Sequence, residues 1–216
     1  MSNEIILNKL KESIAEMDRD MAVEAANEAI AAGMDPLVCI DKGLSAGMQI
    51  MSDLFDDGEA FVPELVESSE AFNAAVAVLT ESMSDEDKKA ASAGIAVVYT
   101  VQGDIHDIGK NIVRTLFEAN NFEIYDLGRD VAAELVLEKA EEVGAQVILG
   151  SALMTTTMPS QRGLIELLKS EGVREKYFVM FGGAPVTNEW VVEIGGDAYT
   201  ETATEAVTVA KEYLGK

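Results

Sequence analysis

Apolar residues in the first 80 positions recur at the spacing of amphipathic helices. The clearest stretch starts at Asp35-Pro36, a pair suited to a helix N-terminus, and ends before Gly58. Its apolar face is formed by Leu37, Ile40, Leu44, Met48, Met51 and Phe55. Similar patterns predict further helices over residues 6–17, 21–32 and, after Val62-Pro63, 65–79. Four amphipathic helices joined by short loops predict a four-helix bundle.

Beyond residue 90 the pattern changes to short β-rich runs that alternate with helical stretches. Strands are predicted over residues 95–101, 122–125, 145–149 and 177–180, and helices over stretches such as 108–119 and 164–170. A fifth strand near residues 197–199 and a closing helix from Thr202 complete the alternation. The whole chain is therefore α/β: a helical bundle followed by a flavodoxin-like (Rossmann-type) domain with a five-stranded parallel sheet. Ligands of such folds bind beyond the carboxyl ends of the strands.

The boundary between the two patterns falls in the small and charged residues 82–89, which gives domains 1–90 and 91–216. The 216 residues are 48 % hydrophobic and carry a net charge of -23, which argues against nucleic acid and anionic membranes as partners. The N-terminus has no basic leader, and no apolar run approaches the ~20 residues of a membrane span. With the single Cys39, these features predict a cytoplasmic protein.

The segment between residues 102 and 111, QGDIHDIGKN, directly follows the first predicted strand. It contains His106, the only histidine, between Asp104 and Asp107. A lone histidine is often structural, but an imidazole that ligates a metal usually donates its other N–H to a carboxylate, and Asp104 could accept it. One histidine cannot build an ordinary zinc or iron site, whereas a metal already held by a macrocycle needs only one ligand. These residues alone do not separate haem iron from corrin cobalt.

Asp104, His106 and Gly109 form a D-x-H-x-x-G motif that resembles the cobalamin-binding domain family, as do Ser151-Ala152-Leu153 and Gly182-Gly183 further on. The resemblance implies a cobalamin or related corrinoid bound base-off/His-on, cycling between methylcob(III)alamin and cob(I)alamin. His106 would be the axial cobalt ligand, with Asp104 holding it.

The same resemblance gives roles to the downstream signatures. It implies that Ser151 extends the hydrogen-bond chain, that Leu153 and Thr155 lie near the cofactor, and that Gly182 and Gly183 leave room for its nucleotide tail. Without the family, Ser151 and the three threonines at positions 155–157 could be ordinary helix-capping residues, and the glycine pair could be a turn.

The helical half resembles the cap module of methionine synthase and of the corrinoid proteins of methanol, methylamine and O-demethylase systems, through residues 53–66, DLFDDGEAFVPELV. In that family, apolar residues at the positions of Phe55, Val62 and Leu65 cover the upper corrin face. On helix periodicity alone, the three would be bundle core.

The resemblance implies a methyl carrier without a complete active site of its own. A substrate-specific corrinoid methyltransferase would methylate Co(I), and a second methyltransferase would pass the methyl group to tetrahydrofolate or a thiol, with a reductive activase as a further partner. Two alternatives remain at this point: the small cobalamin-binding subunit of an adenosylcobalamin-dependent mutase, and a cobalamin-based regulator. The cap-like segment disfavours the first, and the lack of a basic helix-turn-helix segment disfavours the second.

Overall fold

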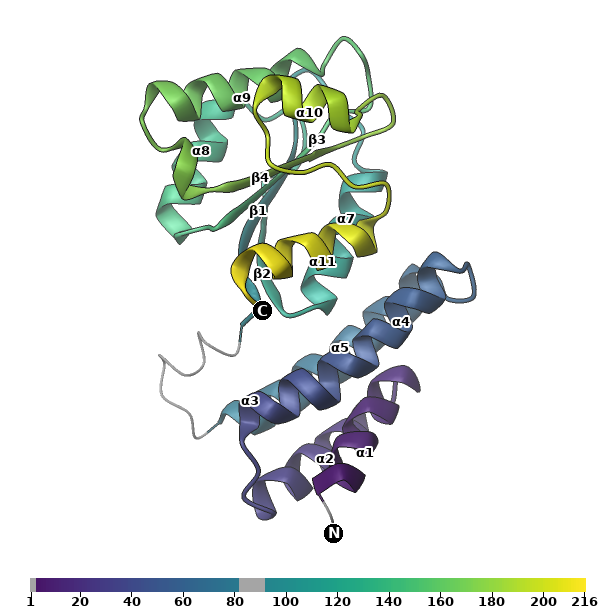
Figure 1. The fold of residues 1–216 in the computed structure, drawn as a ribbon. Helices are drawn as coiled ribbons and strands as arrows, with labels where there is room; N and C mark the ends of the chain where they lie inside the picture. The colour runs from purple at the N-terminus through teal and green to yellow at the C-terminus, as the bar shows by residue number, and fades with distance from the viewer. Residues whose placement is uncertain (1–2, 82–91) are drawn as a thin grey trace. The chain divides into compact units, whose positions relative to one another are not determined.

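The computed structural model describes residues 3–81 and 92–216, and the first of these ranges is helical. Its elements are α1 (Asn3–Ala15), α2 (Arg19–Ala31), α3 (Pro36–Cys39), the π-helical η1 (Ile40–Ser45), α4 (Ala46–Asp56) and α5 (Val62–Thr80). Because α3, η1 and α4 follow one another without a break, they form the long third helix that the apolar spacing predicts (Figure 1). The predicted four-helix bundle is confirmed.

Two glycines let α1 lie close against this third helix. A Cβ added to Gly47 would lie 2.5 Å from the carbonyl oxygen of Lys11 and 2.7 Å from Cβ of Ile14. One added to Gly43 would lie 2.9 Å from Cβ of Leu10. Both distances are shorter than packed atoms tolerate, so the bundle depends on the missing side chains at these two positions.

The second described range alternates strands and helices. Its elements are β1 (Gly94–Thr100), α7 (Ile108–Ala119), β2 (Phe122–Asp126), α8 (Ala133–Val143), β3 (Val147–Ser151), α9 (Pro159–Ser170), the short 3-10 helix η2 (Arg174–Lys176), β4 (Phe178–Gly182), α10 (Asn188–Ile194) and α11 (Ala203–Leu214). The strands pair in parallel in the order β2-β1-β3-β4, the flavodoxin-like order. The predicted α/β fold is confirmed.

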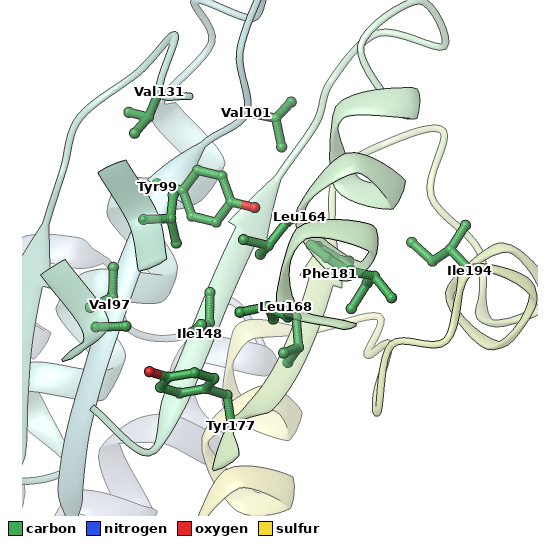
Figure 2. Packing of buried hydrophobic residues seen from close by; sticks show 14 of the residues in the cluster. Val97, Tyr99, Val101, Val131, Ile148, Leu164, Leu168, Tyr177, Phe181 and Ile194 are labelled. Carbon is green, nitrogen blue, oxygen red and sulfur yellow. The ribbon is translucent and has the colours of Figure 1, made fainter. Parts of the chain in front are cut away.

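Helices cover both faces of this sheet, with α8, α9 and α10 on one side and α7 and α11 on the other (Figure 1). Strands sandwiched in this way must be apolar on both faces, which explains the nearly continuous burial of β1. A hydrophobic core lies under α8 and α9, where Tyr99, Ile148, Leu164 and Phe181 pack together (Figure 2). The opposite face of the strands is left to α7 and α11.

The sheet of the described residues has four strands, so the prediction of a fifth strand near residues 197–199 was wrong. That segment makes a single bridge, between Met180 and Ala198. The side chain of Asp197 explains this, because its carboxylate accepts the Val179 N–H at 2.7 Å and so occupies a donor that a longer ladder would need. The same carboxylate pairs with Arg174 at 2.8 Å.

The chain separates into two compact units between Ser92 and Ala93, with the short segment Glu118–Asn121 grouped with the first unit. Among the described residues, no helix is both long and apolar enough to cross a membrane.

We predict that Gly47→Ala lowers the stability of the helical unit by about 1–3 kcal/mol, because the added methyl group overpacks the contact with α1. Thermal unfolding followed by far-UV circular dichroism measures this effect. Gly163→Ala is the control, since a Cβ at this helical glycine meets nothing within 4 Å, and it should be neutral or slightly stabilising. Equal melting of Gly47→Ala and the unsubstituted protein would contradict the close approach.

Candidate functional site

The loop between β1 and α7 carries the histidine motif and is fixed by neighbouring groups. The buried hydroxyl of Thr100 donates to the carbonyl of His106 at 2.9 Å. Gly103 adopts φ +86°, a conformation that favours glycine, and its N–H donates to the Asp130 carboxylate at 2.7 Å. The N–H of Asp130 in turn donates to the carbonyl of Asp104 at 3.0 Å. The sheet edge therefore sets the position of the loop.

Asp104 and His106 form a close pair at the end of this loop. The Nδ1 atom of His106 lies 2.7 Å from Oδ1 of Asp104, and the same oxygen accepts the His106 backbone N–H at 3.0 Å. Asp104 is completely buried, whereas the imidazole is 46 % exposed. In a neutral imidazole, a carboxylate facing Nδ1 favours the tautomer with the proton on that atom, and Nε2 is then the nitrogen able to bind a metal.

The second oxygen of Asp104, Oδ2, is held by the start of the β3–α9 loop. It accepts the Leu153 N–H at 2.8 Å, the Met154 N–H at 3.3 Å and the Thr157 hydroxyl at 2.7 Å. Burial by itself would raise the pKa of Asp104, but the hydrogen bonds from the His106 amide, the Thr157 hydroxyl, the His106 ring and the Leu153 amide lower it well below its usual range. Asp104 is therefore a buried carboxylate that stays ionised and orients the imidazole.

Thr157 is the residue of this network that sequence reasoning missed. It is 5 % exposed, whereas Thr155 and Thr156 beside it are exposed. Three consecutive threonines give no sequence signal that singles out the one that turns inward. The hydroxyl that bonds Asp104 belongs to Thr157, and Ser151 lines the cavity described next. The cofactor roles of Ser151 and Thr155 stay predictions.

A cavity of about 500 Å³ lies next to His106, between the sheet and helices α7 and α11. Six of the residues singled out in the sequence line it: His106, Gly109, Ser151, Leu153, Gly182 and Gly183. They lie at or just after the carboxyl ends of β1, β3 and β4, which the parallel sheet brings to one edge. The structure thus gathers residues that lie up to 77 positions apart, the separation of His106 and Gly183, around one space.

Gly109, Gly182 and Gly183, which line the cavity, differ in their packing and in their backbone conformation. A Cβ at Gly109 or Gly182 would meet nothing within 4 Å, and neither residue has a positive φ, so packing and backbone strain do not require glycine there. Gly183 has φ +124°, and its Cβ would lie 1.8 Å from the carbonyl oxygen of Ala152. Gly183 therefore serves the turn, whereas a methyl group at Gly109 or Gly182 would enter open space.

These residues fit a corrinoid. Among the described residues, no group of three or more His, Cys, Asp and Glu side chains could hold a bare metal ion. A single exposed imidazole held by a carboxylate suits a metal that a macrocycle already holds, and the adjacent cavity gives space for a nucleotide tail. His106 would bind the metal, and Asp104 and Thr157 would orient it.

The residues expected to cap the cofactor lie in the helical unit. Phe55 and Val62 are half-buried, while Leu65 is fully buried in the bundle. Among the described residues of this unit, Phe61 is the most exposed large apolar side chain, at 62 %. It lies at the N-cap of α5, outside the apolar periodicity, which is why the helical pattern does not find it. The cap roles of Phe55, Val62 and Leu65 stay predictions.

Comparison with known proteins gives similarity over nearly the whole chain. Residues 94–209 match a family model described as B12 binding domain, and residues 6–80 match a second model with the same description. The chain is 46 % identical to trimethylamine corrinoid protein 2 of Methanosarcina acetivorans, covering 96 % of both chains. It is 47 % identical to dimethylamine corrinoid protein 1 of Methanosarcina mazei, covering 99 % of this chain and 98 % of that one.

A solved structure extends the similarity to three dimensions. The methanol:cobalamin methyltransferase complex of Methanosarcina barkeri contains a chain that is 33 % identical, with a TM-score of 0.79, covering 99 % of this chain and 81 % of that one. Sequence and structure thus agree on the same group of proteins.

We predict that Thr157→Val destabilises the second unit by about 1–2 kcal/mol, because it removes a buried hydroxyl from Asp104 without leaving a large cavity. Thr157→Ser keeps the hydroxyl and should lie closer to the unsubstituted protein. Urea unfolding followed by fluorescence of Trp190 reports on this unit, since it holds the only tryptophan. If the valine variant unfolds at the same urea concentration as the unsubstituted protein, Thr157 does not hold the carboxylate.

Proposed function

The chain belongs to the family of corrinoid proteins with B12 binding domains, and from this premise we propose that it carries methyl groups between two methyltransferases. It would accept a methyl group from a substrate-specific corrinoid methyltransferase and deliver it to a second one that uses tetrahydrofolate or a thiol. The observation that carries the proposal is the exposed imidazole of His106, held by buried Asp104 beside a cavity of about 500 Å³.

We propose that the methyl donors are methylated amines. The relatives named for trimethylamine and dimethylamine are 46 % and 47 % identical to this chain, against 33 % for the chain from the methanol system. The trimethylamine and dimethylamine proteins are about equally similar to this chain, so we propose methylated amines as a class and not one particular amine.

The cofactor would be bound base-off/His-on. When bound, its cobalt supplies a strong nucleophile for the methyl group and the bond that carries it. The residues of this chain do the rest: His106 provides Nε2 as the axial ligand, Asp104 fixes the ring and its proton on Nδ1, and Thr157 fixes Asp104. Gly109 and Gly182 keep the cavity open for the displaced tail.

The division of labour between the two parts of the chain follows from their chemistry. We assign residues 1–90 to a cap and residues 91–216 to the cofactor domain. The cap would use Phe55, Val62 and Leu65, and exposed Phe61 is an additional candidate. Apolar side chains over the cofactor would exclude water from the methyl group until a partner enzyme binds.

As a carrier, the chain would need two partner enzymes. One would load the methyl group, and the other would remove it. The similar chain of the methanol system occurs in a complex with its methyltransferase, which supports the first partner. The second methyltransferase and a reductive activase complete the proposal.

The test is methyl transfer with defined partners. Protein loaded with reduced cobalamin is mixed with a trimethylamine, dimethylamine or methanol methyltransferase and the matching donor, and the consumption of the donor is measured by mass spectrometry. We expect at most one methyl group taken per bound corrinoid with at least one methylamine system, none with methanol, and none with the cofactor-free protein. Transfer from methanol alone would contradict the donor class, and transfer from none would contradict the carrier function.

A further inference from the structure

We propose that the cavity selects corrinoids by the base at the end of their nucleotide tail, and that it takes a benzimidazole in preference to a purine. This inference rests on the proposed function, because it requires the tail to lie in the cavity beside His106.

An apolar row across three strands forms part of the cavity wall. Val98 of β1 is paired in register with Leu149 of β3, which is paired with Met180 of β4. All three line the cavity. The helices add Ile112 and Ala206 from α7 and α11. We call the row of Val98, Leu149 and Met180 the floor.

Polar groups lie nearer to the carboxyl ends of the strands. Two residues beyond the floor, Ser151 of β3 is paired with Gly182 of β4. Thr200 lies two residues beyond Ala198, which bridges Met180, and Glu201 and Thr202 follow it. Ser151, Thr200, Glu201 and Thr202 all line the cavity. The cavity therefore has a polar mouth and an apolar floor.

Lys110 is the charged lining residue that comes from α7. Its side chain is 2 % exposed, and its ammonium group donates to the carboxylate of Asp126 and, at 2.8 Å, to Oδ1 of Asn111. These two acceptors take two of the three ammonium N–H groups, and Lys110 lies on α7 and is not part of the floor.

This polarity gradient decides which tail fits. The base is the terminal group of the tail, so with the tail in the cavity the base would lie against the floor, and the ribose and phosphate would lie nearer to the mouth. The six-membered ring of a benzimidazole carries only carbon, whereas that of adenine carries two nitrogens and an amino group. Polar groups buried without hydrogen-bond partners weaken binding, by about tenfold to a hundredfold for one or two such groups.

The experiment compares three corrinoids on the full chain by anaerobic equilibrium dialysis: cobalamin, an adenine-tailed cobamide and tail-less cobinamide. Each dissociation constant is corrected for the fraction of free cofactor whose base is off the cobalt, which is measured from its absorption spectrum. We expect cobalamin to bind about tenfold or more tightly than the adenine-tailed cobamide.

Two substitutions at the floor sharpen the comparison. Met180→Gln keeps the length of the side chain and adds an amide that can bond a purine, so it should reduce the preference to within about threefold. Met180→Leu keeps the floor apolar and should retain the preference. When the ratio of the two dissociation constants is compared between variants, the intrinsic tendency of each base to leave the cobalt cancels, because it is a property of the free cofactor.

The possible outcomes distinguish the preference for a benzimidazole tail from the methyl-carrier function on which it rests. Equal corrected affinities for both tails in the unsubstituted protein would overturn the selection, as would cobinamide binding as tightly as cobalamin. Either result would leave the methyl carrier standing. If none of the three corrinoids binds, both proposals fail.

Discussion

The contact between the buried carboxylate of Asp104 and the half-exposed imidazole of His106 is the interaction on which the site depends. An unpaired carboxylate would be costly at full burial, and this one is stabilised by donors from its own loop and from the β3–α9 loop. Asp104 thus ties together two loops that are far apart in the sequence. These hydrogen bonds of Asp104 set the orientation of the imidazole, and with it the position of any metal that the imidazole binds.

The fold explains why one face of the sheet holds the site. On the α8–α9 face, large side chains such as Tyr99 and Phe181 fill the core (Figure 2). On the other face, Gly109 and Gly182 line the cavity, and a Cβ added at either position would meet no atom within 4 Å. A stable core on one side therefore supports an open cavity on the other, and parallel strands deliver the lining residues to its mouth.

Much of the fold could be predicted from the sequence, because helices and strands follow local patterns of apolar residues. The helical bundle and the four strands follow from periodicity. The corrinoid assignment of the motif around His106 comes instead from its resemblance to the cobalamin-binding domain family. The fifth strand could not be excluded, since its failure depends on a contact between Asp197 and the backbone of β4. Thr157 could not be chosen among three threonines, and Phe61 lies at a helix cap where periodicity gives no signal. Each miss concerns a contact between residues distant in the chain or a position outside a regular element.

The most direct test of the account is whether Nε2 of His106 binds the cobalt. The protein is produced with nitrogen-15 histidine, loaded with unlabelled cobalamin, reduced to Co(II) and measured by electron paramagnetic resonance. Because His106 is the only histidine, the label marks one ligand. Axial ligation by His106 gives doublet superhyperfine splitting from the labelled ring; a triplet from the cofactor's own base, or no bound cobalamin, would contradict this ligation.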